Sequence, residues 1–107
     1  MSNSNQVTLF GRLGANPVLK YTQKSEPVCT FSIAINDELN DKPRWQKVVV
    51  WGKQGEDCNL HLKKGKPIFV RGQIQEKEFQ SQDGLKKYTE LKAETIGTLF
   101  LEGDSNG

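Results

Sequence analysis

The sequence is poor in the residues that metal sites and most active sites use. It holds one histidine, His61, and two cysteines, Cys29 and Cys58, which form no C-x-x-C motif. A lone histidine rules out most histidine-based metal and catalytic sites, and cysteines without histidine companions are typical of buried free thiols. The chain also lacks a phosphate-binding glycine loop, a recognisable pair of catalytic carboxylates and a nucleophile–base pair. We therefore expect a protein that is not an enzyme and that uses neither a metal nor a cofactor.

Long hydrophobic runs are absent as well. No apolar stretch approaches the ~20 residues that a membrane span needs, and the N-terminus, M-S-N-S-N-Q, has no signal-peptide core. The 107 residues suit one compact domain, and a formal net charge of +2 excludes a polybasic tail. The basic excess lies in residues 1–53, and this modest asymmetry does not by itself prove a nucleic-acid partner. We expect a soluble, intracellular protein of the cytoplasm.

Alternating apolar residues predict strands over most of the chain. Gly11 and Gly14 suggest a bend or bulge in the first strand, and a break is expected near Gly97 in the last one. Asp83-Gly84 is a strong turn pair and predicts the tip of a hairpin. The strands are expected over residues 6–13 with a short continuation at 18–22, and over 27–35, 45–51, 67–79 and 85–101.

One convincing helix is predicted, over residues 54–64. Cys58, His61 and Leu62 fall on one side of it at helical spacing, and Gly65 stands where a C-terminal cap is expected. The order is thus three strands, one helix and two strands, which is the order of a five-stranded Greek-key barrel with its helix between strands three and four. The sequence predicts an all-β OB-fold domain over 6–101, between a flexible arm, 1–5, and a short polar tail, 102–107.

The strand at 45–51, W-Q-K-V-V-V-W, carries both tryptophans of the chain. Side chains alternate along a strand, so Gln46, Val48 and Val50 share one face. The other face carries Trp45, Lys47, Val49 and Trp51. Aromatic rings beside cations are suited to unpaired bases and their phosphates. The alternative is that one or both tryptophans pack in the core or against another subunit.

Four stretches in this order and spacing resemble the bacterial single-stranded-DNA-binding protein family, and the resemblance covers residues 7–101. They are V-T-L-F-G-R-L-G-A-N-P-V-L-K-Y-T at 7–22, W-Q-K-V-V-V-W-G-K at 45–53, L-K-K-G-K-P-I-F-V-R-G-Q-I at 62–74, and D-G-L-K-K-Y-T-E at 83–90. The resemblance implies sequence-independent binding of single-stranded DNA in replication, recombination or repair, near the nucleoid. It also implies a homo-oligomer, a homotetramer or alternatively a dimer.

The resemblance further implies which residues meet the DNA. Bases are expected to stack on the aromatic residues Trp45, Trp51 and Phe79, and on His61, which stands where the family can have an aromatic. Phosphates are expected to meet the basic residues Lys20, Lys47, Lys53, Lys63, Lys64 and Lys77. Taken singly, Phe79 could instead pack on a neighbouring subunit, and each lysine could be an ordinary solvated side chain.

Three departures from the family pattern bear on these expectations. Leu39 lies near the position of a further family tryptophan, so one stacking platform is expected to be missing. The arm around Glu76 and Glu78 is less basic than in well-known members, which predicts weaker binding there. The chain ends at E-G-D-S-N-G without the acidic tip that recruits replication and repair proteins, so recruitment is not expected. A protein–protein adaptor built on the same barrel is therefore the second hypothesis, and weak affinity for oligo-dT would favour it.

Overall fold

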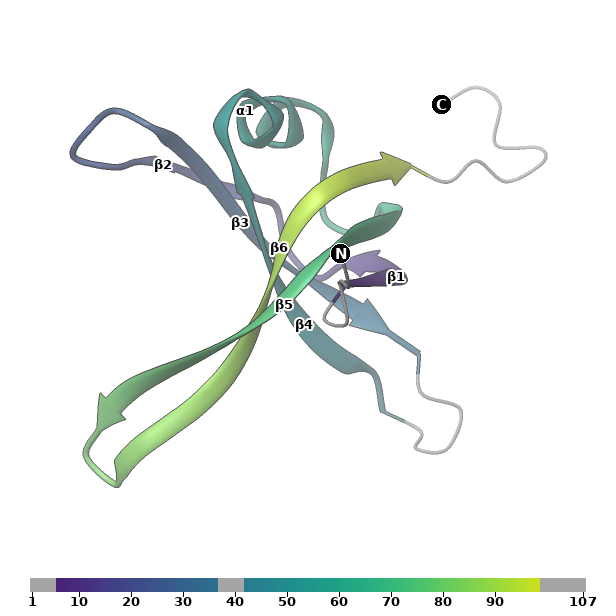
Figure 1. Ribbon diagram of the computed structural model, residues 1–107. Helices are drawn as coiled ribbons and strands as arrows, with labels where there is room; N and C mark the ends of the chain where they lie inside the picture. The colour runs from purple at the N-terminus through teal and green to yellow at the C-terminus, as the bar shows by residue number, and fades with distance from the viewer. Residues whose placement is uncertain (1–5, 37–41, 99–107) are drawn as a thin grey trace.

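The computed structural model describes residues 6–36 and 42–98, and Figure 1 shows the arrangement of their strands and helix. The arm at 1–5, Leu39, the tail at 102–107 and the end of the strand predicted over 85–101 lie outside the described residues. The elements in chain order are β1 (Gln6–Leu13), β2 (Val18–Tyr21), β3 (Pro27–Ile35), β4 (Arg44–Trp51), α1 (Gly52–His61), β5 (Pro67–Ser81) and β6 (Gly84–Thr98).

The strands form one sheet that closes on itself. Its order is β1-β5-β6-β4-β3-β2, and β1 also pairs with β3 through Arg12 opposite Ala34 and Leu13 opposite Ile33. All pairs are antiparallel except β4 with β6, which run parallel. β1 and β2 are the two parts of the predicted first strand, and the helix follows the third strand of that count. The prediction of a five-stranded OB-fold barrel is confirmed.

The core fills the inside of this barrel. Strand alternation directs Cys29, Phe31 and Ile33 of β3 inward, and all three are buried. The helix adds Cys58, and Leu62 just beyond its end is buried beside it. The other buried members of the core are Leu13, Val48, Val50, Ile68, Val70 and Leu91.

The helix begins and ends earlier than predicted, at Gly52 and His61 instead of 54 and 64. Gly52 has a φ of 74°, a conformation that glycine adopts easily, so the chain turns from strand into helix without a linker. At the other end Leu62 is extended and buried, which ends the helix before Lys63. Leu62 lies beyond the helix and not on its side as predicted, and His61, three residues after Cys58 on α1, is exposed at the last position of the helix.

Gly14 bends the chain at the end of β1, as predicted, but the other glycines act differently from the prediction. Gly11 causes no bulge: it pairs in register with Ile68, and its missing side chain admits the Ala34 carbonyl, which would lie 2.6 Å from a Cβ. The last strand is also unbroken at Gly97, where the ring of Phe69 fills the space of a side chain. The register shift lies between Arg71 and Gly72 of β5 instead. Gly65 is not the helix cap but adopts a φ of 88° in the turn before β5.

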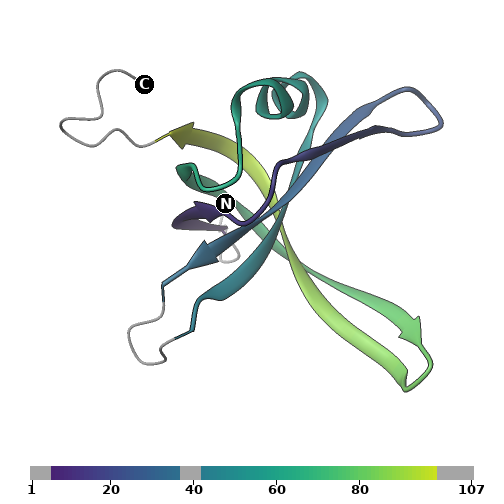
Figure 2. The same cartoon turned by 180° about the vertical axis from the view of Figure 1, so that it is seen from behind.

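The β5–β6 hairpin is longer than the barrel needs. Its ladder runs without interruption from Gly72 to the turn at Ser81 and Gly84, well beyond the part of β5 that pairs with β1. Both opposite views show it leaving the barrel as a two-stranded arm that points away from α1 (Figures 1 and 2). We call residues 74–90 of this hairpin the arm.

Candidate nucleic-acid interface

The pairing of β3, β4 and β6 places one row of side chains on the outside of the barrel. Lys47 of β4 lies between Ser32 on β3 and Glu90 on β6, and directly paired residues point to the same face. Across this face the register adds the outward residues of β2 and of the arm. We call the following set the groove face: Val18, Lys20, Val28, Thr30, Ser32, Ala34, Trp45, Lys47, Val49, Trp51, Gln75, Lys77, Phe79, Lys86, Tyr88, Glu90 and Lys92.

The tryptophans lie on this face as predicted. Trp45 is 55% exposed and Trp51 is 39% exposed, whereas Val48 and Val50 on the opposite side are completely buried. The alternative that the tryptophans pack in the core of this chain is therefore wrong. Val49 shares their face and is nevertheless buried, at 7% exposure.

A shallow hollow of about 390 Å³ lies beside Trp45. The loop after β1 forms one wall through Gly14 and Asn16, and β3 and β4 form the floor. Lys47 lines the hollow together with Trp45, so a cation and an aromatic ring border the same space. A flat base with its phosphate could contact both.

Lys20 lies at the other end of the row. It pairs with Val28 on β3, and Val28 pairs in turn with Trp51 on β4. Lys20 and Trp51 therefore flank the same β3 residue on one face, which repeats the neighbourhood of a cation and a ring seen at Trp45.

The arm continues the row with a second aromatic group. The rings of Phe79 and Tyr88 are 5.8 Å apart, and the ammonium of Lys47 lies 5.5 Å from the centre of the Tyr88 ring. Phe79 is 49% exposed. Lys77 pairs with Tyr88, and Phe79 with Lys86, so cations and rings alternate along the arm. The side chains from Lys47 to Phe79 thus form one continuous series of contacts.

Two of the predicted phosphate ligands already have acidic partners. The Lys47 ammonium lies 3.1 Å from the carboxylate of Glu90, and the Lys53 ammonium lies 3.7 Å from Asp57, one helical turn away. Both partners of the second pair are well exposed, so that pair exchanges readily with solvent or a ligand. Glu90 is only 15% exposed, so its pair with Lys47 is the more sheltered of the two.

The remaining predicted residues lie on the helix side of the barrel. Lys53 and His61 are on α1, and Lys63 and Lys64 follow it; all four are exposed. The amide of Lys64 donates a hydrogen bond of 2.9 Å to the side chain of Asn16, which lines the hollow beside Trp45. Lys64 is thereby tied to the edge of the groove face, while no recorded contact of the described residues ties His61 to it.

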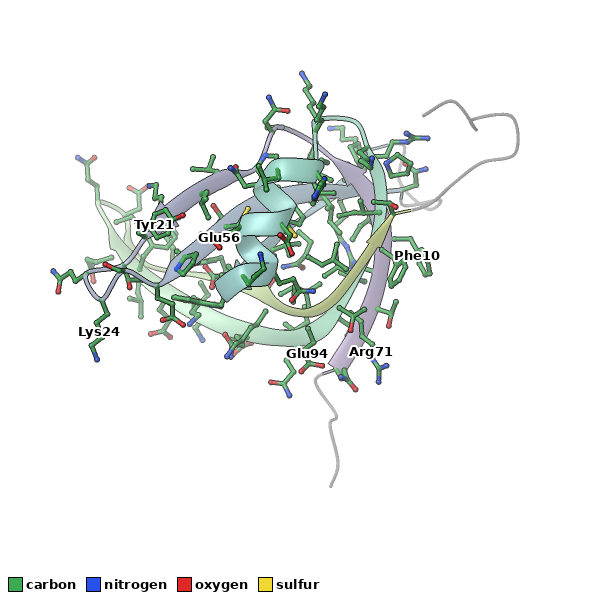
Figure 3. All side chains as sticks on the ribbon, turned by 90° about the horizontal axis from the view of Figure 1, so that it is seen from above. Phe10, Tyr21, Lys24, Glu56, Arg71 and Glu94 are labelled. Carbon is green, nitrogen blue, oxygen red and sulfur yellow. The ribbon has the colours of Figure 1, made fainter. Side chains whose placement is uncertain are left out.

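The helix is also joined to β2. Figure 3 shows Tyr21 of β2 beside Glu56 of α1, and the tyrosine hydroxyl donates a hydrogen bond of 2.9 Å to that carboxylate. This hydrogen bond raises the pKa of Tyr21, with smaller contributions from desolvation of the hydroxyl and from the negative charge of Glu56. The β2–β3 hairpin, which carries Lys20, is therefore attached to the helix.

Comparison with known proteins agrees with this geometry. The profile of the Single-strand binding protein family matches residues 4–99. The chain belongs to this family. Among its curated relatives is Single-stranded DNA-binding protein 1 of Xylella fastidiosa, 33% identical over 115 aligned positions that cover 99% of this chain and 85% of the relative. Single-stranded DNA-binding protein 3 of Listeria innocua is 37% identical, covering 96% of this chain and 67% of that protein.

The relatives differ in length. A Single-stranded DNA-binding protein of Neisseria meningitidis is 33% identical over 90 positions, which are 78% of this chain and 52% of that protein. The chain thus spans about half the length of this relative. Family membership, first indicated by the four sequence stretches, is confirmed by the match over residues 4–99.

Three groove-face residues escaped the sequence analysis. Tyr88 contacts both Phe79 and Lys47, and Lys86 and Lys92 add exposed cations. The signal for Tyr88 and Lys86 was the turn pair at the hairpin tip, because a hairpin tip sets which residues of the two strands face each other. Lys92 could not be found in this way, since its place beside Val49 depends on the pairing of β4 with β6.

Other kinds of site find no support in residues 6–36 and 42–98. In these segments no group of three or more histidine, cysteine or acidic side chains could hold a metal ion. None of the helices found there is long and apolar enough to cross a membrane. Cys29 and Cys58 are free and buried, as the sequence predicted.

Proposed function

We propose that this chain binds single-stranded DNA without sequence preference, by stacking bases on the rings of the groove face and meeting phosphates with its lysines. The observation that carries the proposal is the series Trp45, Lys47, Tyr88 and Phe79 across β4 and the arm, in which Lys47 lies beside the half-buried ring of Tyr88 and the rings of Trp45 and Phe79 are exposed. Every base has an aromatic face, so stacking of this kind tolerates any sequence. The function is therefore binding and protection of the strand, without a chemical step.

The stacking platforms of this proposal are Trp45, Trp51 and Phe79, with Tyr88 added and His61 at the helix end. The exposure of Trp45 and Phe79, 55% and 49%, favours them over Trp51 at 39%. Each stacked base contributes about 1–3 kcal/mol by alanine substitution. Duplex DNA binds much more weakly on this proposal, because its bases are already stacked on each other.

The proposed phosphate ligands are the lysines Lys20, Lys47, Lys53, Lys63, Lys64 and Lys77. Lys20, Lys47 and Lys77 lie on the groove face beside the rings, and Lys64 is tied to its edge through Asn16. Lys53 and Lys63 lie further along the helix side of the barrel. They contact DNA phosphates if the bound DNA strand continues past Trp51. Lys86 and Lys92 extend the same path over β6.

We further propose a homotetramer, with a dimer as the alternative. Phe10 of β1 is 58% exposed and its ring lies 6.1 Å from that of Phe69 on β5, which makes an apolar patch outside the groove face. Beside this patch Gln6 joins Arg71 and Glu94, which Figure 3 labels together with Phe10. A particle of four times 12.1 kDa in light scattering supports the tetramer, and a 12.1 kDa particle at micromolar concentration contradicts any oligomer.

The proposed setting is the nucleoid in the cytoplasm, in replication, recombination or repair, since these processes expose single strands. The deciding experiment is a fluorescence titration with oligo-dT. Both tryptophans lie on the groove face, so saturation quenches much of the intrinsic emission, and Trp45→Ala weakens binding by about 1–3 kcal/mol. A folded parent protein that fails to bind oligo-dT at low salt contradicts the proposal and favours the protein–protein adaptor.

A further inference from the structure

The groove face carries one acidic side chain among the residues that the strand register assigns to it. That residue is Glu90, which lies on β6 directly beside Lys47 of β4 in the parallel pair. Glu76 and Glu78 of the arm pair with Thr89 and Lys87, and both belong to the opposite face. A surface that meets a polyanion thus has a single carboxylate, placed between its rings.

This carboxylate is held in place and sheltered from solvent. Its side chain is 15% exposed, against 44% for Lys47, and the two charged groups are 3.1 Å apart. The same ammonium lies 5.5 Å from the centre of the Tyr88 ring. Lys47 is therefore held from two sides, by an anion and by an aromatic face.

We infer that Glu90 limits the affinity of this face for single-stranded DNA by neutralising Lys47. The inference rests on the proposed function, because it concerns the strength of that binding. A phosphate that approaches Lys47 meets a neutral pair instead of a free cation, and the nearby carboxylate repels it. To bind Lys47, the phosphate must displace Glu90 from its ion pair with that lysine. Glu90 is then left unpaired in a sheltered position, where an unpaired charge is unfavourable.

The position of Glu90 has a consequence for release of the strand. Stacking on Tyr88 and Trp45 does not depend on the charge of Glu90. These rings therefore bind bases while Lys47 between them contributes little to the affinity. Glu90 also re-forms its pair with Lys47 as soon as the phosphate leaves, which favours dissociation. Most changes of affinity within one interface are changes of the dissociation rate, so we expect Glu90 to act there.

The test is Glu90→Gln, which keeps the shape of the side chain and removes its charge. Oligo-dT should bind about three- to tenfold more tightly at low salt, mainly through slower dissociation in stopped-flow measurements. The slope of log affinity against log salt should steepen by about 0.7, the value for one more phosphate contact on a single strand. Unchanged or weaker binding by the folded variant overturns the inference.

Two controls separate the local pair from the overall charge. Glu78→Gln removes the same charge from the opposite face of the arm, and it should change affinity less than about twofold, because solvent and salt screen distant exposed charges. In a Lys47→Gln background, Glu90→Gln should give no more gain than Glu78→Gln. An equal gain with and without Lys47 shows that Glu90 does not act through the lysine, and this also overturns the inference.

A second substitution and a second readout keep the test decisive. If Glu90→Gln does not fold by circular dichroism, Glu90→Thr removes the charge with a residue suited to a strand, and the same gain is expected. A parent protein that does not bind oligo-dT contradicts the proposed function itself. A parent that binds while the variants show no gain contradicts only the role of Glu90.

Discussion

The indole ring of Trp45 lies directly on Gly14, where it occupies the space that a side chain at residue 14 would need. The amide of Gly14 donates a hydrogen bond of 3.0 Å to the carbonyl of Ser32, which fixes this part of the loop on β3. One side of the ring is thus supported by a fixed backbone, and the ring as a whole stays 55% exposed. A platform that is already oriented loses less conformational freedom when a base stacks on it.

We expect Gly14→Ala to weaken binding of oligo-dT although residue 14 offers the DNA no side chain. The added methyl group would overlap the ring and displace it, so the loss should approach the 1–3 kcal/mol of about one stacked base. Fluorescence titration measures the loss, and a thermal melt checks the fold. In a Trp45→Ala background the same substitution should cost almost nothing more; an equal cost in both backgrounds contradicts the positioning role.

Tyr88, which the sequence analysis missed, should prove to be a stacking residue. Tyr88→Ala is expected to weaken binding by about 1–3 kcal/mol, because it removes a ring that contacts both Phe79 and the Lys47 ammonium. Tyr88→Phe keeps the ring and should bind nearly as the parent does. Leu85→Ala is the matched control, since Leu85 is also exposed on β6 but on the opposite face. Equal losses for Leu85→Ala and Tyr88→Ala would show that the arm contributes only through its stability.

The salt dependence of binding should distinguish the paired lysines from the free ones. For Lys77 no ion pair is recorded in the described part of the chain, and Lys77→Ala should reduce the slope of log affinity against log salt by about 0.7. Lys47→Ala should reduce it less, because Glu90 already neutralises that charge. Titrations with oligo-dT at several salt concentrations measure both slopes. A larger change for Lys47 than for Lys77 would be the opposite of this expectation.

Cys58 should be inert in the folded protein. Burial raises the pKa of its thiol to about 12, and the nearby Cys29 and Asp57 add to the effect. Thiol reagents react with the thiolate, so labelling at pH 8 should be slow until a denaturant unfolds the chain. Rapid labelling of the native protein at Cys58 would contradict this burial.

The same pKa predicts loss of stability in alkali. The unfolded thiol ionises near its ordinary value of 9.0, whereas the folded thiol stays protonated up to about pH 12. The unfolded state therefore gains free energy by ionising first, and the contribution of Cys58 to stability declines as the pH rises above about 9. Thermal melts between pH 8 and pH 11 should show a smaller decline for Cys58→Ala than for the parent.

The faces of single strands could be predicted because the alternation of side chains is a local property of the backbone. The pattern at 45–51 placed Trp45 and Trp51 on the face opposite Val48 and Val50, and the structure agrees, because the valines are buried and the tryptophans are exposed. The predicted helix boundaries were wrong because the actual boundaries depend on the backbone angle of Gly52 and on the burial of Leu62. Both depend on how the helix packs on the barrel.

Sequence alone determined the fold class, the family and the row of side chains that Trp45 and Trp51 share on β4, because these follow from local periodicity and from four recognisable stretches. The neighbours of that row were decided only by the tertiary structure. A two-residue turn at Asp83-Gly84 would set Phe79 opposite Tyr88, but the chain turns at Gln82 and Asp83 and sets Phe79 opposite Lys86. Glu90 lies 43 residues after Lys47 along the chain, and only the parallel pairing of β4 with β6 brings the carboxylate to the ammonium. Strand periodicity is short-range, whereas register between distant strands depends on closure of the whole barrel.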